Sequence, residues 1–224
     1  MSEKNYKEYK IILIGNSAVG KTAFFKKITK GFFSDKNIST IGIDKCTLYF
    51  KDVEVNLKGN NKKEEFNIIL FDTAGQERYR ALAKNYFTST DIVMLIYDIT
   101  EKKTFVDIEK WLDDIKDKLS DWKTGHYTII LLGNKLDLAD GENGKREVKE
   151  EDAENFCDEN SINWGGECSC KDFSQEQLKQ LLLNSFKKYV EKFGVKEAPD
   201  SFKKLSVKKK KKSMLRIKIL YNIL

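Results

Sequence analysis

One stretch near the N-terminus constrains the fold more than any other: residues 9–30 hold an apolar run, a glycine-rich turn and a helix. The apolar run, residues 9–14, is typical of a strand covered on both faces of a parallel sheet. It ends in a segment that fits G-x-x-x-x-G-K-[ST] at every fixed position, namely Gly15, Asn16, Ser17, Ala18, Val19, Gly20, Lys21 and Thr22. Such a loop lets successive backbone N–H groups converge on phosphate oxygens, and the helix that follows points its positive end at the same anion. We therefore predict a phosphate site, with Lys21 at the terminal phosphates and Thr22 as a ligand of Mg²⁺, rather than a glycine turn with a chance lysine.

The charge of the chain is unevenly distributed, which bears on its partners. At 224 residues the chain is long enough for one α/β domain and a tail. Residues 195–224 carry ten Lys or Arg and two acidic residues, so their net charge is +8. This exceeds the net charge of +6 of the whole chain, so the remainder is slightly acidic. We therefore predict a domain over residues 1–194, a basic disordered tail over residues 195–224, and no nucleic-acid binding. Four scattered cysteines, no secretory signal and no apolar stretch of about 20 residues indicate a cytoplasmic protein.

After the first helix, the sequence alternates between strand and helix patterns. The expected strands are residues 41–57 and 66–71, joined by a turn at 59–63, then 92–97, 127–132 and 162–164; the expected helices are 105–119, 150–158 and 175–193. The alternation of the first of these strands slips near Lys51 and Asp52, which predicts a bulge. Thr104 is the expected cap of the 105–119 helix, and Trp111 lies on its apolar stripe. We predict an α/β fold: a doubly wound, mostly parallel six-stranded sheet with one antiparallel edge strand and helices on both faces.

Three further segments follow strands, at the sheet edge where ligands bind in such folds. In the first, Asp72 can hold Mg²⁺ through water, Gly75 offers a backbone N–H to a γ-phosphate, and Gln76 can orient a water for in-line attack. In the second, Asn134, Lys135 and Asp137 follow a buried strand. The third holds Ser169, Cys170 and Lys171, whose backbone N–H groups lie where a base carbonyl would be met. The three segments together predict a nucleotide site.

Asp137 indicates which nucleotide is bound. A carboxylate accepts two hydrogen bonds from the N1–H and exocyclic amine of guanine, whereas adenine offers no such donor pair on that edge. The mismatch costs on the order of 1–3 kcal/mol or more, because a charged group is left without a partner. Lys135 can lay its alkyl stem along the base. We therefore predict a preference for guanine nucleotides.

Taken together, these motifs resemble those of the Ras superfamily of small GTPases over about residues 8–193. The segments most like the Rab branch are residues 39–44 (STIGID), 72–80 (DTAGQERYR) and 97–100 (YDIT). The resemblance implies the P-loop GTPase fold, with Thr40 closing on Mg²⁺ and the γ-phosphate in the GTP state, and Phe33 packing against the guanine. It implies two switch segments at residues 34–45 and 73–87, with Gln76 as the catalytic residue. Lys21, Thr22 and Asp72 would hold the phosphates and the metal.

The same resemblance implies a function. The protein would be a monomeric switch that binds GTP and GDP with Mg²⁺, hydrolyses GTP slowly, and regulates vesicle traffic through effectors that bind its GTP state. An exchange factor and a GTPase-activating protein that supplies an arginine are the implied regulators. The implied location is the cytoplasm, peripheral on the cytosolic face of an endomembrane. The alternatives are a pseudo-GTPase scaffold that binds nucleotide without significant hydrolysis, and a P-loop kinase or ATPase, which the guanine-selecting segment disfavours.

The chain departs from the Rab pattern in several places. Lys45 stands where Phe is usual, Phe71 stands where Trp is usual, and the hairpin over residues 51–63 is longer. In the base-contacting S-A-K segment, Cys170 replaces the alanine. No cysteine follows Cys170, although Rabs end in cysteines that are prenylated. Three interpretations of the tail stay open: its lysines hold an anionic membrane, it is solvated and disordered, or the true C-terminus ends in cysteine.

Overall fold

The computed structural model describes residues 6–34, 42–57, 59–74, 87, 90–118, 125–140 and 143–196. Its strands are β1 (Lys7–Ile14), β2 (Ile43–Leu57), β3 (Asn60–Thr73), β4 (Ile92–Asp98), β5 (Thr128–Asn134) and β6 (Asn163–Cys168). Its helices are α1 (Lys21–Lys30), α3 (Lys102–Val106), α4 (Ile108–Lys118), α5 (Leu136–Ala139), α6 (Glu150–Asn160) and α7 (Gln175–Phe193). The predicted residues Thr40, Gly75 and Gln76 and residues 197–224 of the basic tail lie outside the described residues. One compact unit spans Glu8–Gly194.

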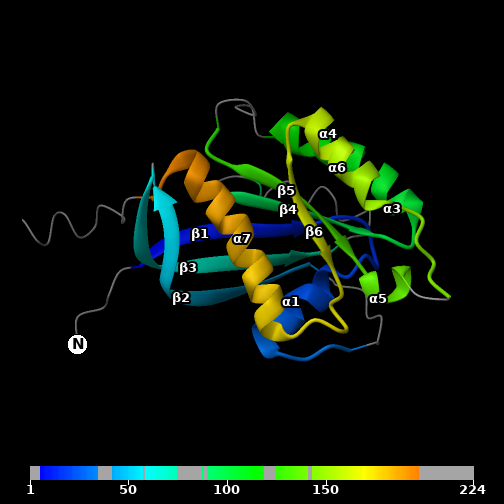
Figure 1. The fold of residues 1–224 in the computed structure, drawn as a ribbon, viewed down its shortest axis with the longest axis horizontal. Helices are drawn as coiled ribbons and strands as arrows, with labels where there is room; N and C mark the ends of the chain where they lie inside the picture. The colour runs from blue at the N-terminus through cyan, green and yellow to red at the C-terminus, as the bar shows by residue number, and fades with distance from the viewer. Residues whose placement is uncertain are drawn as a thin grey trace, which may run out of the picture. The chain divides into compact units, whose positions relative to one another are not determined.

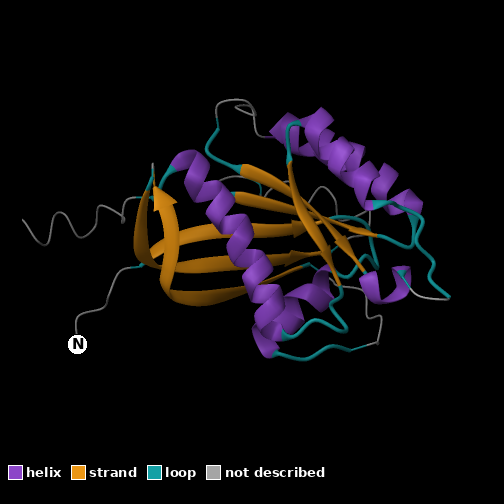
Figure 2. Cartoon of the chain, viewed as in Figure 1, coloured by secondary structure: helices purple, strands orange, loops and turns teal. Residues whose placement is uncertain are grey.

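The six strands form one sheet in the order β2-β3-β1-β4-β5-β6 (Figure 1). The pairs β1–β4, β4–β5 and β5–β6 are parallel, and β2 pairs antiparallel with β3 at the edge. Helices lie on both faces of the sheet (Figure 2). This arrangement confirms the predicted fold class. It arises because βαβ crossovers place parallel strands side by side and cover both faces of the sheet with helices.

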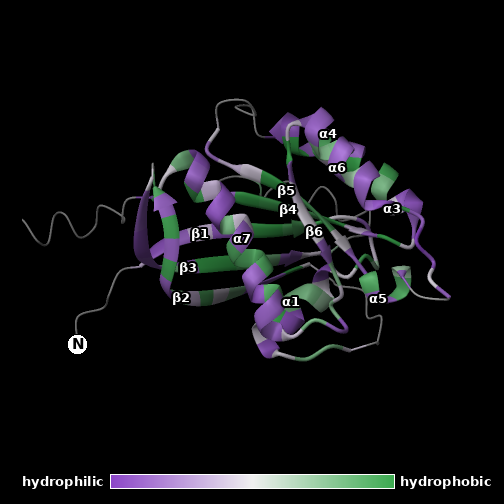
Figure 3. Ribbon diagram, in the orientation of Figure 1, coloured by the Kyte–Doolittle hydropathy of each residue, from purple (hydrophilic) through white to green (hydrophobic). Residues whose placement is uncertain are grey.

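The two faces of β1 belong to two cores. Ile12 and Ile14 belong to a cluster with Trp111, Leu112 and other residues of α4 and α6. On the opposite face, the ring of Tyr9 packs edge-on against Phe66 of β3 and Phe186 of α7. In Figure 3 the central strands are mostly hydrophobic and the outer turns of the helices hydrophilic. Because each strand of the centre is buried on both sides, the sequence there reads as a continuous apolar run.

The β2–β3 hairpin carries the predicted bulge. The register shifts between Phe50 and Val53, and Asp52 adopts the left-handed conformation with φ 55°. The predicted turn at 59–63 was too long, because β3 already begins at Asn60 and Lys62 lies opposite Val55. Charged residues are tolerated in this strand because the outer part of an edge hairpin leaves one face in water.

The predicted 105–119 helix is two helices, interrupted at Asp107. Thr104 is not the cap: Glu101 is the N-cap residue of α3, and Thr104 lies within that helix. The Thr104 hydroxyl accepts a hydrogen bond from the Asp98 N–H at 3.0 Å and donates to the Glu101 carbonyl at 2.8 Å. A capping threonine and a helical threonine bonded to preceding backbone look alike in sequence, since both satisfy local backbone groups.

The C-terminal part of the unit follows the prediction more closely. Helix α7 runs from Gln175 to Phe193 as expected, and Ser174 forms a capping box with Gln177. Strand β6 is longer than expected and continues to Cys168. A Cβ at position 165 would lie 2.7 Å from Ile130 of β5, so the glycine there allows the two strands to approach closely. No helix among the described residues is long and apolar enough to cross a membrane.

Candidate functional site

The loop between β1 and α1 has a backbone shape that few sequences allow. Gly15 and Gly20 have φ 143° and 103°, and Ala18 is left-handed with φ 64°. A Cβ on Gly15 would lie 2.1 Å from the Ile96 carbonyl oxygen, and one on Gly20 would lie 2.0 Å from the Asn134 Nδ2. Gly20 is the N-cap of α1 and provides no side-chain cap for the first N–H groups of that helix. The free helix N-terminus and the curled loop form an anion-binding arrangement.

Lys21 is buried against this loop. Its side chain is 4% exposed, and its ammonium donates hydrogen bonds to the carbonyls of Gly15 at 2.9 Å and Asn16 at 2.6 Å. Burial lowers the pKa of Lys21 to about 8, and the charge of Asp72 opposes that shift. A buried ammonium that donates to loop carbonyls gains strongly from a nearby phosphate, which brings negative charge close to it.

Asp72 and Thr22 lie together at the end of β3. The Thr22 hydroxyl donates a hydrogen bond to Asp72 Oδ2 at 2.6 Å, while Asp72 Oδ1 is buried and has no hydrogen-bond partner among the described residues. Burial raises the pKa of Asp72 to about 6, partly offset by the Thr22 hydrogen bond and the charge of Lys21. An orphaned carboxylate oxygen beside a hydroxyl is the donor set of a hard cation, so these residues fit Mg²⁺ directly or through water.

Asn134 connects the phosphate loop to the other end of the site. Its side-chain amide donates to the Val19 carbonyl at 2.8 Å, and its Oδ1 accepts from the Cys170 N–H at 3.3 Å. Asn134 is 1% exposed, so both bonds are shielded from water. The segments that begin at residues 15, 134 and 169 are therefore brought together by one side chain.

Asp137 is bonded to Ser169, another of the predicted base-site residues. The Ser169 hydroxyl donates to Asp137 Oδ1 at 2.8 Å and accepts from the Asp172 N–H at 2.9 Å. This chain of bonds fixes one carboxylate oxygen and orients the carboxylate group. The bond from Ser169 therefore holds the Asp137 carboxylate in one orientation.

Lys135 is held by a residue that the sequence analysis did not assign. Lys135 is left-handed with φ 71°, and its ammonium pairs with Asp98 Oδ2 at 2.5 Å. The other oxygen of Asp98 accepts from the Thr100 N–H at 2.9 Å and hydroxyl at 2.7 Å. Asp98 is the last residue of β4, and its place at the carboxyl end of a parallel strand was the signal that could have identified it.

The other predicted site residues divide into two groups. Phe33 is half-buried in the loop after α1, and Lys171 is exposed, with its carbonyl 3.5 Å from the Lys27 ammonium. Thr40, Gly75 and Gln76 lie outside the described residues. The phosphate-loop residues, Asp72 and the predicted base-site residues at 134–137 and 169–171 lie near one another, because they stand at or just after the carboxyl ends of β1, β3, β5 and β6.

Comparison with known proteins agrees with this arrangement. The Ras family model matches residues 10–191. Ras-related protein Rab-30 of Homo sapiens is 37% identical over 148 residues, which cover 66% of this chain and 64% of that protein. Ras-related protein YPTC6 of Chlamydomonas reinhardtii is 32% identical over 184 residues, 82% of this chain and 77% of that protein. Ras-related protein RabJ of Dictyostelium discoideum is 31% identical over 191 residues, 83% of this chain and 68% of that protein.

The family match, over residues 10–191, extends across most of the compact unit. The chain spans about 64% of the length of the Rab-30 proteins that it matches. The YPTC6 and RabJ matches cover more than two thirds of both chains. By the family match, by these relatives and by its sheet topology, the chain belongs to the Ras family, as a small GTPase of the Rab type.

Proposed function

We propose that the protein is a guanine-nucleotide switch that binds GTP and GDP with Mg²⁺ and hydrolyses GTP slowly. The observation that carries the proposal is the Asn134 side chain, which joins the Val19 carbonyl of the phosphate loop to the loop at Cys170. Because of this link, the phosphate end and the base end of the site are fixed at one spacing. A nucleotide that bridges both ends would gain from every contact at little cost in reorganisation.

The roles of individual residues form part of the proposal. The phosphate loop (Gly15, Asn16, Ser17, Ala18, Val19, Gly20, Lys21 and Thr22) and Gly75 bind phosphates, and Phe33, Asn134, Lys135, Asp137, Ser169, Cys170 and Lys171 bind the guanosine. Thr22, Thr40 and Asp72 hold Mg²⁺, which neutralises charge on the phosphates when it is bound. Gln76 orients the attacking water.

Slow hydrolysis follows from what the chain supplies. Phosphoryl transfer needs an oriented water and positive charge around the transferred group, and here Lys21 provides charge while Gln76 positions water. An arginine from a partner would complete the charge and raise the rate by about 10³–10⁵. A single-turnover phosphate-release assay tests this, with Gln76→Leu expected to slow release by about tenfold or more. If the wild-type protein binds GTP but releases no phosphate, the pseudo-GTPase scaffold replaces the proposal.

We further propose that the GTP state recruits effectors of vesicle traffic from the cytosolic face of an endomembrane, with the basic tail at residues 195–224 assisting. The proposal rests on the Rab-type relatives and on the lysines of the tail. A pull-down with protein loaded with a non-hydrolysable GTP analogue, compared with GDP-loaded protein, tests it. Partners retained only in the first state would support the switch, and an identical set in both states would contradict it.

A further inference from the structure

The side chain of Asn16, a residue of the phosphate loop, is bonded to residues outside that loop. Its Nδ2–H donates to Asp107 Oδ2 at 2.8 Å, and its Oδ1 accepts from the Trp111 Nε1–H at 2.9 Å. Both polar atoms of the amide therefore have a partner from one region, the junction of α3 and α4. In the sequence, Asn16 belongs to the phosphate motif and Trp111 to the apolar stripe of a helix, and nothing in the spacing predicts a hydrogen bond between them.

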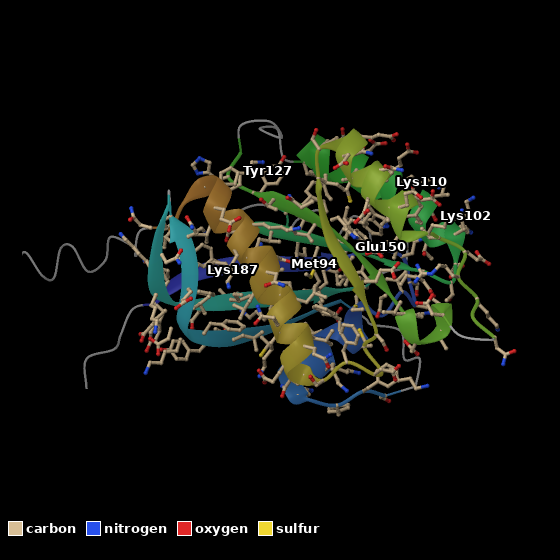
Figure 4. The ribbon with its side chains drawn as sticks, in the orientation of Figure 1. Met94, Lys102, Lys110, Tyr127, Glu150 and Lys187 are labelled. Carbon is tan, nitrogen blue, oxygen red and sulfur yellow. The ribbon has the colours of Figure 1, made fainter. Side chains whose placement is uncertain are left out.

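The two partners of Asn16 are themselves well anchored. Trp111 is 3% exposed and belongs to the core cluster between the sheet and α4. Asp107 lies where the helical path is interrupted, and Lys110, at 66% side-chain exposure, bonds to its other oxygen at 2.5 Å. Hydrogen bonds from Lys110 and Asn16 lower the pKa of Asp107, so its carboxylate stays ionised at neutral pH. Lys110 belongs to α4, and in Figure 4 its label lies on the outer side of the helices.

The loop needs such an anchor. Ala18 is a non-glycine residue in the left-handed region, a conformation that surrounding structure must enforce. Asn134 fixes the end of the loop near Val19, whereas the carbonyls near its start, at Gly15 and Asn16, accept hydrogen bonds from Lys21. Lys21 is the residue that a phosphate would engage, so it cannot hold the loop independently of the ligand. The Asn16 side chain fixes the start of the loop through hydrogen bonds that do not involve the ligand.

We propose that Asn16 is a positioning residue, which through Asp107 and Trp111 holds the phosphate loop in its binding shape and thereby slows the release of nucleotide. This inference rests on the proposed function, since it deepens the account of the same site. A neutral hydrogen bond, such as the one from Trp111, changes an equilibrium constant or a rate by about 2- to 13-fold, and a charge-assisted one, such as the one to Asp107, by about 13- to 160-fold. Loss of both bonds should therefore accelerate GDP release by about 25-fold or more.

The test is the dissociation rate of a fluorescent N-methylanthraniloyl GDP from full-length protein with Mg²⁺ present. Asn16→Ala removes both bonds and should release GDP about 25-fold or more faster, whereas Trp111→Phe removes only the neutral bond and should release it about 2- to 13-fold faster. Asn16→Asp puts two carboxylates side by side, and should release GDP at least as fast as Asn16→Ala. Adding Asp107→Asn to Asn16→Asp exchanges donor and acceptor between the two positions. That double variant should return to within about threefold of the wild-type rate.

Trp164→Phe is the matched control for Trp111→Phe. It removes the same indole N–H, which in Trp164 bonds to Glu150 Oε1 at 3.4 Å on the α6 side of the fold. Its rate should stay within about twofold of wild type. If wild-type protein binds GDP and Asn16→Asp releases it at the wild-type rate, or the exchange variant stays as fast as Asn16→Asp, the inference is wrong. If wild-type protein binds no GDP, the proposed function itself fails.

Discussion

The Asn134 amide donates a hydrogen bond to the Val19 carbonyl at 2.8 Å, across 115 positions of sequence. The same side chain accepts a bond from the Cys170 N–H, so the ends of β5 and β6 and the phosphate loop share one buried polar group. A buried amide that satisfies groups on two loops fixes the distance between them, because loss of either bond leaves a desolvated polar atom.

Asn134→Ala is predicted to weaken binding of GDP and of GTP alike. The substitution leaves the Val19 carbonyl and the Cys170 N–H without their partner, at about 1–3 kcal/mol for each buried group. Affinity should fall by about 10-fold or more for both nucleotides, measured by calorimetry with Mg²⁺. Gln180→Ala, which changes an exposed amide on α7 that bonds only to Asn184 in the described structure, is the control and should bind as wild type. If Asn134→Ala bound both nucleotides with unchanged affinity, Asn134 would not be what links the two ends of the site.

Gly15→Ala is predicted to be far more destabilising than Gly59→Ala. Both glycines have positive φ, 143° and 84°, so both variants strain the backbone. A Cβ at position 15 also meets the Ile96 carbonyl oxygen at 2.1 Å, whereas a Cβ at position 59 meets nothing within 4 Å. We expect a loss of about 1 kcal/mol for Gly59→Ala and of more than about 3 kcal/mol for Gly15→Ala, by urea unfolding. Equal losses would mean that the loop does not pack against β4 as described.

The raised pKa of Asp72 predicts a pH-dependent stability. Because burial raises this pKa from 3.8 to about 6, the folded state binds the proton more tightly than the unfolded state, and stability falls as pH rises from about 4 to 6. In EDTA at pH 7.5, Asp72→Asn should therefore be more stable than wild type, by up to about 3 kcal/mol, and the difference should shrink at pH 4.5. With Mg²⁺ and GDP the order should reverse, since the metal needs the carboxylate.

Thermal unfolding at the two pH values measures this difference. Asp113→Asn, on the exposed side of α4, is the matched control and should shift stability by less than about 0.5 kcal/mol at either pH. A wild-type protein in EDTA that is more stable than Asp72→Asn at pH 7.5 would show that Asp72 carries no desolvation cost.

The fold and most of the converging residues were predictable because their signals are local. The apolar runs of β1, β4 and β5 and the motif at residues 15–22 specify strands and a loop, and the rule that ligand residues follow parallel strands brings them together. Among the contacts that the sequence did not reveal, those of Asn16 with Trp111 and of Lys135 with Asp98 join residues 95 and 37 positions apart. Side-chain pairing at that separation depends on the packed fold, and no periodicity encodes it.

The errors in local structure have a similar origin. A continuous apolar stripe from residue 105 to 119 predicts one helix, yet Asp107 interrupts it, and its carboxylate is bonded to Asn16 of another loop. Likewise, the polar residues 59–63 predict a turn, but pairing with β2 extends strand β3 through residues 60–63. In both places a tertiary contact overrides the local pattern.

The most direct test of the account is calorimetry of the wild-type protein and of Asp137→Asn, each with GTP and with ATP in the presence of Mg²⁺. The carboxylate of Asp137, oriented by Ser169, should make wild-type protein prefer GTP by about 10-fold or more, and Asp137→Asn should lose that preference. Equal affinity of the wild-type protein for the two nucleotides, or binding of neither, would contradict the assignment of this site to guanine nucleotides.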